Sequence, residues 1–271
     1  MTTKTFKGKI IFLHGYTQSS TLFYAKTSGL RKKLAKLGYK SVYINGPYIL
    51  TPSQLPTTDS LSKFGSSSAD DVIYRAWWLK HDQTNDGINL DESITAIRNY
   101  IDKGELVNDE GEVSVDVDEL PIVGIIGFSQ GAALAGLLAY KFNELFGVSS
   151  VKFVVLYSGF KLNTEKKSGN EKYDSYYPKE SAVQDIKYLH VYGELDTVVE
   201  ESRVLRLYEL TKNSSELLKH PGGHFVPNSK IYIDQVTNWI ESVEQEKEEK
   251  PVDKHEDIAT LMELMDSFGT V

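Results

Sequence analysis

The sequence predicts an α/β fold, a three-layer sandwich in which a mostly parallel central sheet of about six strands is flanked by helices. Two observations lead to this prediction. Short, β-rich apolar runs alternate with segments whose apolar residues recur at helical spacing, a pattern typical of parallel sheets. The 271 residues, 40% of them hydrophobic, are enough for one sizeable core, so no large separate lid domain is expected.

Six apolar runs are the expected strands, and most of them end close to a glycine or another turn-forming residue. They lie at residues 9–13, 39–44, 120–126, 153–157, 188–193 and 215–219. Segments with apolar residues at helical spacing follow most of these runs. They lie at residues 20–37, 90–102, 132–138, 198–212 and 228–244. We therefore expect one α/β domain over residues 1–244.

Three segments depart from this alternation. Residues 48–75 are rich in Ser, Thr and Pro, and a loop of this length inside a domain is usually functional or disordered. Residues 104–119 are acidic and contain glycine, which indicates an exposed surface insertion. Residues 245–271 begin as a charged linker and continue as a short amphipathic helix. That helix is expected to dock on its own domain or to fray, and the functional alternative is that it binds a partner, including a second copy of the chain in self-association.

Composition and charge exclude several classes of function. The formal net charge of −8 argues against nucleic acid or an anionic membrane surface as the main partner. The absence of cysteine excludes disulfides, thiolate metal sites and a cysteine nucleophile. No apolar run approaches the ~20 residues that span a bilayer, and the N-terminus lacks the apolar stretch of a signal peptide. We expect a soluble protein of the cytoplasm, or also of the nucleus.

The stretch Gly127-Phe128-Ser129-Gln130-Gly131 carries the strongest indication of chemistry. It follows an apolar strand and precedes a helix of small residues, so the order is strand, sharp turn, helix. This setting is typical of a nucleophile elbow, which exposes the serine above a sheet edge on a strained backbone. Bulky residues at the two glycine positions would block the turn. The alternative is that Ser129 is a simple helix N-cap.

A serine hydroxyl needs an imidazole to accept its proton and an acid to orient that imidazole. In this arrangement the acid and then the histidine follow the serine along the chain, each in a loop after a strand. His224 follows the last expected strand and two glycines, so it is the candidate base, and His220 is expected to have no catalytic role. Asp196 is the candidate acid and Glu194 the alternative, although Asp196 can also cap the next helix.

The remaining histidines have plainer expected roles. His14 braces the loop after the first strand, His190 belongs to the core, His81 lies in a polar loop and His255 lies in the C-terminal tail. Metal ligation is not expected, because His224 stands apart from any second histidine and carboxylate set, and we expect no cofactor.

Ester chemistry also needs N–H donors for the oxyanion that develops on the attacked carbonyl oxygen. The residue after the nucleophile, Gln130, offers one backbone N–H at the positive end of its helix. The second donor is expected in the loop after the first strand, from the backbone N–H of Tyr16 or, as an alternative, of Thr17.

Several motifs together carry a resemblance to a known family. They are His14-Gly15-Tyr16-Thr17-Gln18-Ser19, Asn45-Gly46-Pro47, Arg75-Ala76-Trp77-Trp78, Gly127-Phe128-Ser129-Gln130-Gly131, Tyr157-Ser158-Gly159-Phe160, His190-Val191-Tyr192-Gly193-Glu194-Leu195-Asp196 and Gly222-Gly223-His224. Over residues 8–243 the chain resembles the fungal family of serine hydrolases, which is related to the human ovarian-cancer-associated serine hydrolase. The resemblance implies a compact α/β-hydrolase that cleaves carboxylic esters with Ser129, Asp196 and His224 as its catalytic triad.

The substrate is expected to be a small ester with an apolar acyl or alkyl part. Trp77, Trp78, Phe160 and Phe225, together with Tyr16, could form an apolar wall over the nucleophile, or could be ordinary core aromatics. Arg75 is the single basic candidate for binding a phosphate group and is otherwise a structural partner. A thioesterase or lysophospholipase would use the same triad, and a ligand receptor without catalysis could share the fold.

Overall fold

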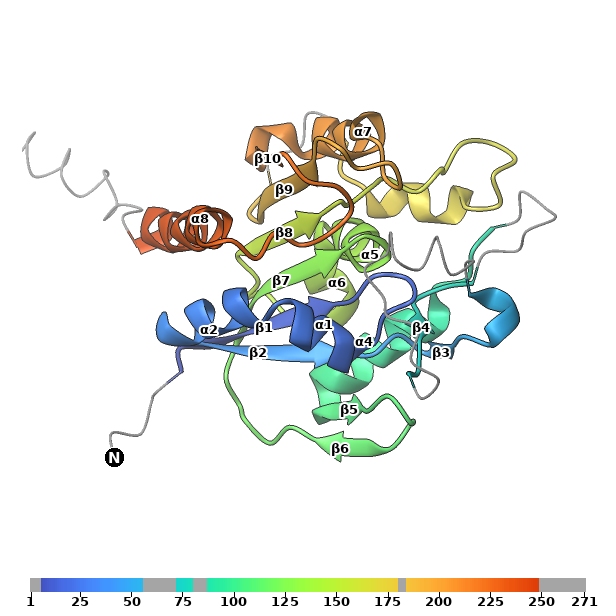
Figure 1. Ribbon diagram of the computed structural model, residues 1–271, viewed down its shortest axis with the longest axis horizontal. Coiled ribbons are helices and arrows are strands. Elements are labelled where there is room, and N and C mark those ends of the chain that lie inside the picture. The colour runs from blue at the N-terminus through green and yellow to red at the C-terminus, as the bar shows by residue number, and fades with distance from the viewer. Residues whose placement is uncertain (1–5, 56–71, 80–86, 180–183, 249–271) are drawn as a thin grey trace, which may run out of the picture.

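A six-stranded parallel sheet organises the chain, with the strand order β10-β9-β8-β7-β1-β2 (Figure 1). The computed structural model describes residues 6–55, 72–79, 87–179 and 184–248. All six expected strands are confirmed to within two residues. They are β1 Gly8–Leu13, β2 Tyr39–Ile44, β7 Ile122–Phe128, β8 Phe153–Tyr157, β9 Lys187–Gly193 and β10 Ser215–His220.

The burial of the strands follows from their sequences. Every residue of β1, β7 and β8 is buried, as their unbroken apolar runs predict for strands covered on both faces. β10 lies at one edge of the sheet and is largely exposed or half-buried, which matches its mixed sequence.

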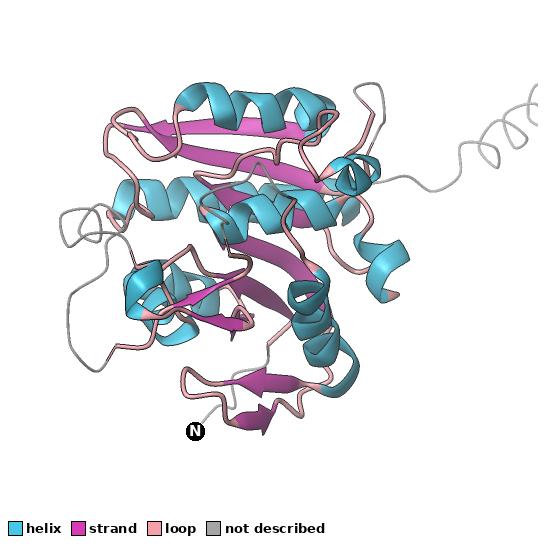
Figure 2. Ribbon diagram, turned by 90° about the vertical axis from the view of Figure 1, so that its right-hand side faces the viewer, coloured by secondary structure: helices cyan, strands magenta, loops and turns pink. Residues whose placement is uncertain are grey.

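Helices cover both faces of the sheet and complete the predicted three layers (Figure 2). One face is packed by α1 Ser20–Lys26, α2 Ser28–Lys36 and α8 Lys230–Glu248. The other face is packed by α4 Asp91–Lys103, α5 Gln130–Ala139, α6 Phe142–Phe146 and α7 Glu201–Thr211. Among the helices of the described ranges, none is long and apolar enough to cross a membrane.

The prediction of one helix over residues 20–37 is wrong, because two helices meet there at Thr27. The Thr27 hydroxyl is held between the Phe23 carbonyl oxygen and the Tyr43 hydroxyl, each 2.7 Å away. A threonine that bonds back to the preceding turn bends a helix, and the Thr27 backbone (φ −101°, ψ 19°) leaves the helical region. The bend lets both α1 and α2 pack on β2.

Other element ends differ from the predictions by a few residues. α7 begins at Glu201 instead of residue 198, because Asp196 binds the N–H groups of Val198 and Val199 in the preceding turn. α8 continues to Glu248, past residue 244, where the charged linker was expected to begin. Residues 249–271, which contain the rest of the expected linker and the expected amphipathic helix, lie outside the described residues. His81 and residues 56–71 of the long loop also lie outside them.

The part of the long loop that the structure describes contains short elements. β3 Tyr48–Ile49 pairs antiparallel with β4 Arg75–Ala76, and the 3-10 helix η1 Pro52–Gln54 follows β3.

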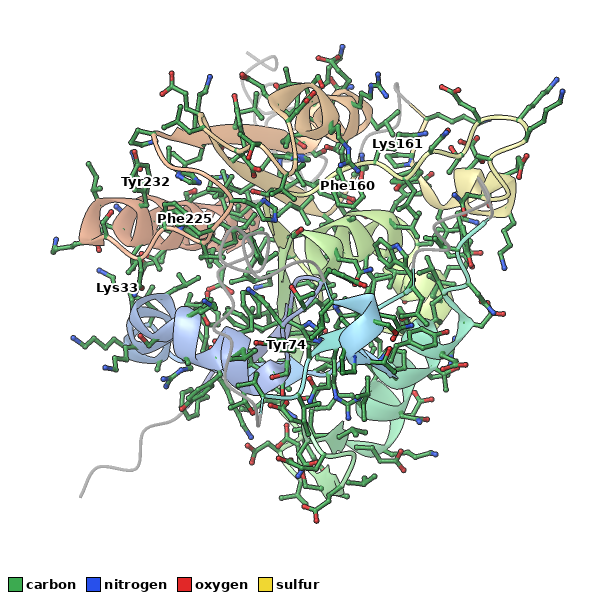
Figure 3. The ribbon with its side chains drawn as sticks, turned by 45° about the vertical axis from the view of Figure 1, so that its right-hand side comes forward. Lys33, Tyr74, Phe160, Lys161, Phe225 and Tyr232 are labelled. Carbon is green, nitrogen blue, oxygen red and sulfur yellow. The ribbon has the colours of Figure 1, made fainter. Side chains whose placement is uncertain are left out.

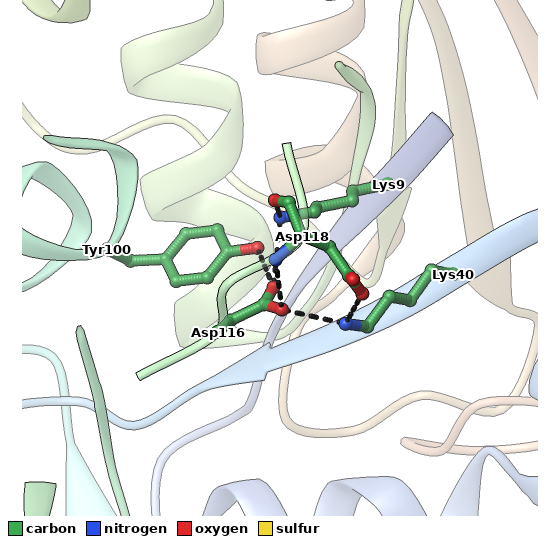
Figure 4. Close-up of polar contacts among 5 residues, drawn as sticks. All are labelled: Lys9, Lys40, Tyr100, Asp116 and Asp118. Atoms are coloured by element: carbon green, nitrogen blue, oxygen red, sulfur yellow. Dashed lines mark hydrogen bonds and ion pairs between the residues drawn. The ribbon is translucent and has the colours of Figure 1, made fainter. Parts of the chain in front are cut away.

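The acidic segment 104–119 forms a hairpin of β5 Glu105–Val107 and β6 Val113–Val115. The outer strand is exposed, as expected for a surface insertion, but the hairpin is tied to the sheet. The Asp116 carboxylate bonds to Lys9 of β1 at 3.0 Å, to Lys40 of β2 at 2.7 Å and to the Tyr100 hydroxyl at 2.9 Å (Figure 4). These bonds join the hairpin to the amino ends of two strands.

Candidate active site

Ser129 lies at the junction of β7 and α5, at the carboxyl edge of the sheet. Its backbone has φ 52° and ψ −113°, a conformation that L-residues rarely adopt, and its N–H donates to the Tyr157 carbonyl oxygen at 2.8 Å. A Cβ atom at Gly127 would come within 2.6 Å of the Ala132 Cα atom, so only glycine permits this turn. The predicted strained elbow is present, with the steric role expected for its first glycine.

The second glycine of the elbow brings the loop after β1 next to α5. A Cβ atom at Gly131 would lie 2.2 Å from the Leu13 carbonyl oxygen and 2.4 Å from that of His14. The absence of this atom lets the chain after Leu13 pass directly over the first turn of α5. The two segments that were expected to supply oxyanion donors are therefore neighbours.

Ser129, His224 and Asp196 form a chain of hydrogen bonds. Ser129 Oγ lies 3.0 Å from His224 Nε2, and His224 Nδ1 lies 2.8 Å from Asp196 Oδ2. All three residues are buried, with exposed fractions of 6%, 6% and 8%. The fold thus unites residues from the ends of β7, β9 and β10 that are separated by up to 95 positions in sequence.

The Asp196 carboxylate accepts hydrogen bonds at both oxygens. Oδ1 accepts from the N–H groups of Val198 (2.9 Å) and Val199 (2.8 Å), and Oδ2 accepts from the Ser158 hydroxyl (2.8 Å) as well as from His224. Burial by itself would raise the pKa of Asp196, but the bonds from His224, Val199 and Ser158 outweigh burial and hold the pKa below its usual value. Asp196 is therefore an ionised acceptor at neutral pH.

The ionised carboxylate determines which nitrogen of the neutral His224 ring carries the hydrogen. Since the Asp196 carboxylate only accepts, His224 Nδ1 must carry a hydrogen and donate it. In the neutral imidazole Nε2 then has a free lone pair, which accepts the Ser129 hydroxyl. The alternative acid, Glu194, is exposed to solvent and binds only through its backbone N–H, to the His220 carbonyl oxygen, in the described contacts.

Ser158 belongs to the site as a partner of Asp196, a role that the sequence analysis did not predict. It has φ 49°, and its N–H donates to the Val191 carbonyl oxygen at 2.7 Å, which turns its hydroxyl toward the Asp196 loop. A serine followed by glycine directly after a buried strand was the available signal.

His14 braces the loop after β1, as predicted. Its Nε2 accepts from the Gly46 N–H at 2.9 Å and its Nδ1 donates to the Gly15 carbonyl oxygen at 2.7 Å, while its own carbonyl oxygen accepts from Trp77 Nε1 at 2.9 Å. Burial lowers the pKa of His14 to about 4, so the ring is neutral and keeps both bonds at physiological pH.

The two proposed oxyanion donors lie in well-anchored segments. Gln130 is the first residue of α5, so its backbone N–H has no acceptor within the helix, and its side chain bonds to the Trp77 N–H and the Trp78 carbonyl oxygen, both at 2.8 Å. In the loop after β1, the Gly15 N–H donates to Gln18 Oε1 at 3.1 Å and Thr17 is buried with φ 58°. The choice between Tyr16 and Thr17 stays a prediction.

Asp109, on the β5–β6 hairpin, anchors the end of this loop and was not predicted. Its carboxylate accepts from the hydroxyls of Ser19 (2.7 Å) and Ser20 (3.3 Å) and from Asn45 Nδ2 (2.9 Å). Ser19 and Ser20 lie within four positions of Tyr16 and Thr17, the residues expected to bind the oxyanion. The hairpin therefore supports the candidate site from outside the sheet.

Arg75 has the structural role that was the alternative to phosphate binding. Its guanidinium is buried and donates to the carbonyl oxygens of Gly46, Asn108 and Asp109 at 2.9 to 3.2 Å. These bonds hold the hairpin against the turn after β2.

Four of the five aromatic residues expected in a substrate wall, Trp77, Trp78, Phe160 and Phe225, lie in different environments. Trp77 is completely buried and Trp78 nearly so, because the bonds to Gln130 and His14 draw them into the core beneath the loop. Phe160 lies under the Arg203 guanidinium at 4.2 Å, and Figure 3 shows it well apart from Phe225. Phe225 is 47% exposed.

A cavity of about 200 Å³ adjoins the candidate site, between α1 and the loop that carries His224. Phe225 lines it, whereas Trp77, Trp78 and Phe160 do not. Its described lining consists of Gln18, Phe23, Lys26, Phe128, His224, Phe225 and Val226. The cavity is therefore largely apolar and touches the imidazole.

The parallel sheet, its helical layers and the serine at a strained strand-to-helix turn define an α/β-hydrolase. Solved structures agree on the fold. Acyl-protein thioesterase 2 of Zea mays superposes with a TM-score of 0.55 at 19% identity, covering 88% of this chain and 94% of that one. Esterase PE8 superposes with a TM-score of 0.51 at 17% identity, covering the same shares.

The family model described as serine hydrolase (FSH1) matches residues 1–236, and the chain belongs to this family. It is 34% identical to Family of serine hydrolases 3 of Saccharomyces cerevisiae, covering 97% of this chain and 98% of the relative. It is 31% identical to Esterase OVCA2 of Danio rerio, covering 81% of this chain and 90% of that protein. The predicted resemblance is thereby confirmed.

Proposed function

We propose that this serine hydrolase cleaves carboxylic esters through a covalent acyl-enzyme, with Ser129 as nucleophile, His224 as base and Asp196 as the orienting acid. The observation that carries the proposal is the hydrogen-bond chain from Ser129 Oγ to His224 Nε2 and from His224 Nδ1 to Asp196. The naming of Esterase OVCA2 among the relatives supports an ester over other acyl compounds.

In the first half of the reaction, His224 Nε2 takes the proton of Ser129 as its Oγ attacks the ester carbonyl carbon. The tetrahedral intermediate collapses when the imidazolium returns that proton to the leaving alcohol, which leaves the acyl group on Ser129. Asp196 stays ionised and stabilises the imidazolium through the 2.8 Å bond to Nδ1.

In the second half, water takes the place of the alcohol. His224 removes a proton from the water, the resulting hydroxide attacks the acyl carbon, and Ser129 leaves with the proton from the imidazolium. The carboxylic acid product is released and the free enzyme is restored.

Both tetrahedral intermediates carry a negative oxygen that needs N–H donors. We assign these to the backbone N–H groups of Gln130 and Tyr16, with Thr17 as the alternative to Tyr16. The close packing of the loop after β1 on the first turn of α5 supports this pairing. Loss of one such donor typically costs ~3 kcal/mol of transition-state stabilisation.

Labelling with a fluorophosphonate probe tests the nucleophile, because the probe reacts with a serine activated by an imidazole. We expect wild type to be labelled and Ser129→Ala to be unlabelled, with loss of ester hydrolysis. Equal labelling of the two proteins contradicts the assignment. A panel of esters of graded chain length, with matched thioesters, identifies the preferred leaving group.

A further inference from the structure

Among the described residues that line the cavity beside His224, Lys26 is the only lysine, arginine, aspartate or glutamate. It is the last residue of α1, three positions after Phe23, so the two residues lie on neighbouring parts of one helix surface. Across the cavity lie Phe225 and Val226 of the loop that carries His224. The side chain of Lys26 therefore contributes to the wall of a space that also touches the imidazole.

No described residue forms an ion pair with Lys26. Its side chain reaches solvent, but the surrounding chain removes part of its hydration, which lowers the pKa of Lys26. Two other lysines, Lys33 of α2 and Lys230 of α8, do have a partner, since both bind Asp234, at 3.0 and 2.7 Å. A partly desolvated ammonium without a partner gains from a negative group placed beside it.

The segment that contains α1 and α2 is basic although the protein is acidic. Residues 20–37 carry five basic residues and no aspartate or glutamate, in a chain with a net charge of −8. The basic residues are Lys26, Arg31, Lys32, Lys33 and Lys36. Of these five residues only Lys26 lines the cavity, so it is the one placed to bind an anionic ligand there.

The rest of the cavity suits a short apolar chain. Phe128 packs at 4.8 Å from the His224 ring and Phe23 stacks on Phe128 at 6.3 Å, which gives the cavity an aromatic floor. Phe225 is 47% exposed and lines the cavity, so a ligand bound there would cover part of its ring. A volume of about 200 Å³ holds a chain of roughly four to six carbon atoms, since a water-sized group occupies about 30 Å³.

We infer that the preferred substrate is an ester with a short apolar chain that ends in a carboxylate, and that Lys26 selects it by binding this carboxylate. One ammonium matches a single negative charge, whereas a phosphate dianion is normally held by several donors. The inference rests on the proposed function, because it assigns the cavity to the substrate of the Ser129 reaction.

Matched pairs of esters test the inference. The first pair varies the acyl part: p-nitrophenyl hexanoate against the mono-p-nitrophenyl ester of adipic acid. The second pair varies the alcohol part: butyl acetate against 4-acetoxybutanoate. In one of the pairs we expect Lys26→Met to lower kcat/KM for the anionic ester about three- to tenfold and to change the neutral ester less than twofold. The responding pair identifies the part of the ester that occupies the cavity.

Lys32→Glu is the matched control for Lys26→Glu, because Lys32 is exposed on α2 and does not line the cavity. We expect Lys26→Glu to discriminate against the anionic ester at least tenfold and Lys32→Glu to do so less than twofold. The neutral ester reports on folding in every variant. Equal discrimination by both variants, or none by either, overturns the inference.

The experiments distinguish a failure of the proposed function from a failure of the inference about Lys26. Hydrolysis of the neutral ester that persists in Ser129→Ala contradicts the proposed function. Hydrolysis that depends on Ser129 but is indifferent to Lys26 contradicts the inference alone. If wild type hydrolyses none of these esters, calorimetry measures binding to Ser129→Ala instead. The two ligands compared are the anionic ester monomethyl glutarate and the neutral ester dimethyl glutarate. Tighter binding of monomethyl glutarate than of dimethyl glutarate, lost when Lys26→Met is added, supports the inference. Equal binding of the two ligands overturns it.

Discussion

His224 Nδ1 lies 2.8 Å from Asp196 Oδ2, and the two side chains are only 2% and 0% exposed. A hydrogen bond between an imidazole and an ionised carboxylate is strong where water is excluded. It holds the ring in the tautomer whose Nε2 faces Ser129. Ser158 and the N–H groups of Val198 and Val199 satisfy the other lone pairs of the carboxylate, so the acid is held in place and ionised.

The substitution Asp196→Asn should lower kcat for ester hydrolysis about 10⁴-fold. An asparagine amide that donates to Nδ1 would place the imidazole proton on Nε2, where it cannot accept from Ser129. Steady-state kinetics measure the loss, and circular dichroism checks that the fold persists. Glu194→Gln is the control, because Glu194 is exposed two residues away, and its activity should stay within twofold. Similar losses in both variants would refute the assignment of the acid.

The substitution Asp109→Ala should lower kcat about tenfold with little change in KM. It removes the acceptor of Ser19, Ser20 and Asn45, so the loop expected to hold the second oxyanion donor loses its anchor. Part of the ~3 kcal/mol that such a donor contributes is then lost in the transition state only.

Glu110→Ala is the matched control for Asp109→Ala, since Glu110 is the next residue and is exposed. It should keep wild-type kcat. If the two variants behave alike, or if Asp109→Ala raises KM and leaves kcat unchanged, Asp109 does not position the loop.

The substitution Asp116→Asn should destabilise the protein by about 3 kcal/mol at pH 7, because it leaves buried Lys9 without its carboxylate. Burial would raise the pKa of Asp116, but bonds from Lys40, Lys9 and Tyr100 hold the pKa well below its ordinary value of 3.8. A carboxyl whose pKa is depressed by folding stabilises the protein above its unfolded pKa, and this contribution is lost as the pH falls below it.

Urea unfolding of wild type and Asp116→Asn at pH 7, 4 and 3 measures this effect. The difference in unfolding free energy should be largest at pH 7 and shrink below about pH 4. Asp118→Asn is the control, because Asp118 is exposed and binds only Lys40 with its carboxylate in the described contacts. A difference that stays constant with pH would show that the Asp116 charge is not responsible.

Local patterns were sufficient for the sheet and for the order of the chemical groups. β1, β7 and β8 were predictable because strands buried on both faces must be continuously apolar. The proximity of Ser129, Asp196 and His224 was predictable because each follows a strand, and the carboxyl ends of parallel strands share one edge of the sheet. The break at Thr27 was missed, since it depends on Tyr43, sixteen positions away.

Contacts between distant segments needed the folded chain. Asp109 reaches Ser19 across 90 positions, and Ser158 reaches Asp196 across 38, with no periodicity that connects them. Lys26 and Phe225 line one cavity although they come from opposite ends of the domain. Periodicity reports which face of an element is buried, whereas these contacts depend on how elements pack. The sequence by itself was therefore sufficient to predict the fold and the family. The shape and charge of the cavity beside His224 were decided by the packing of distant segments in the tertiary structure.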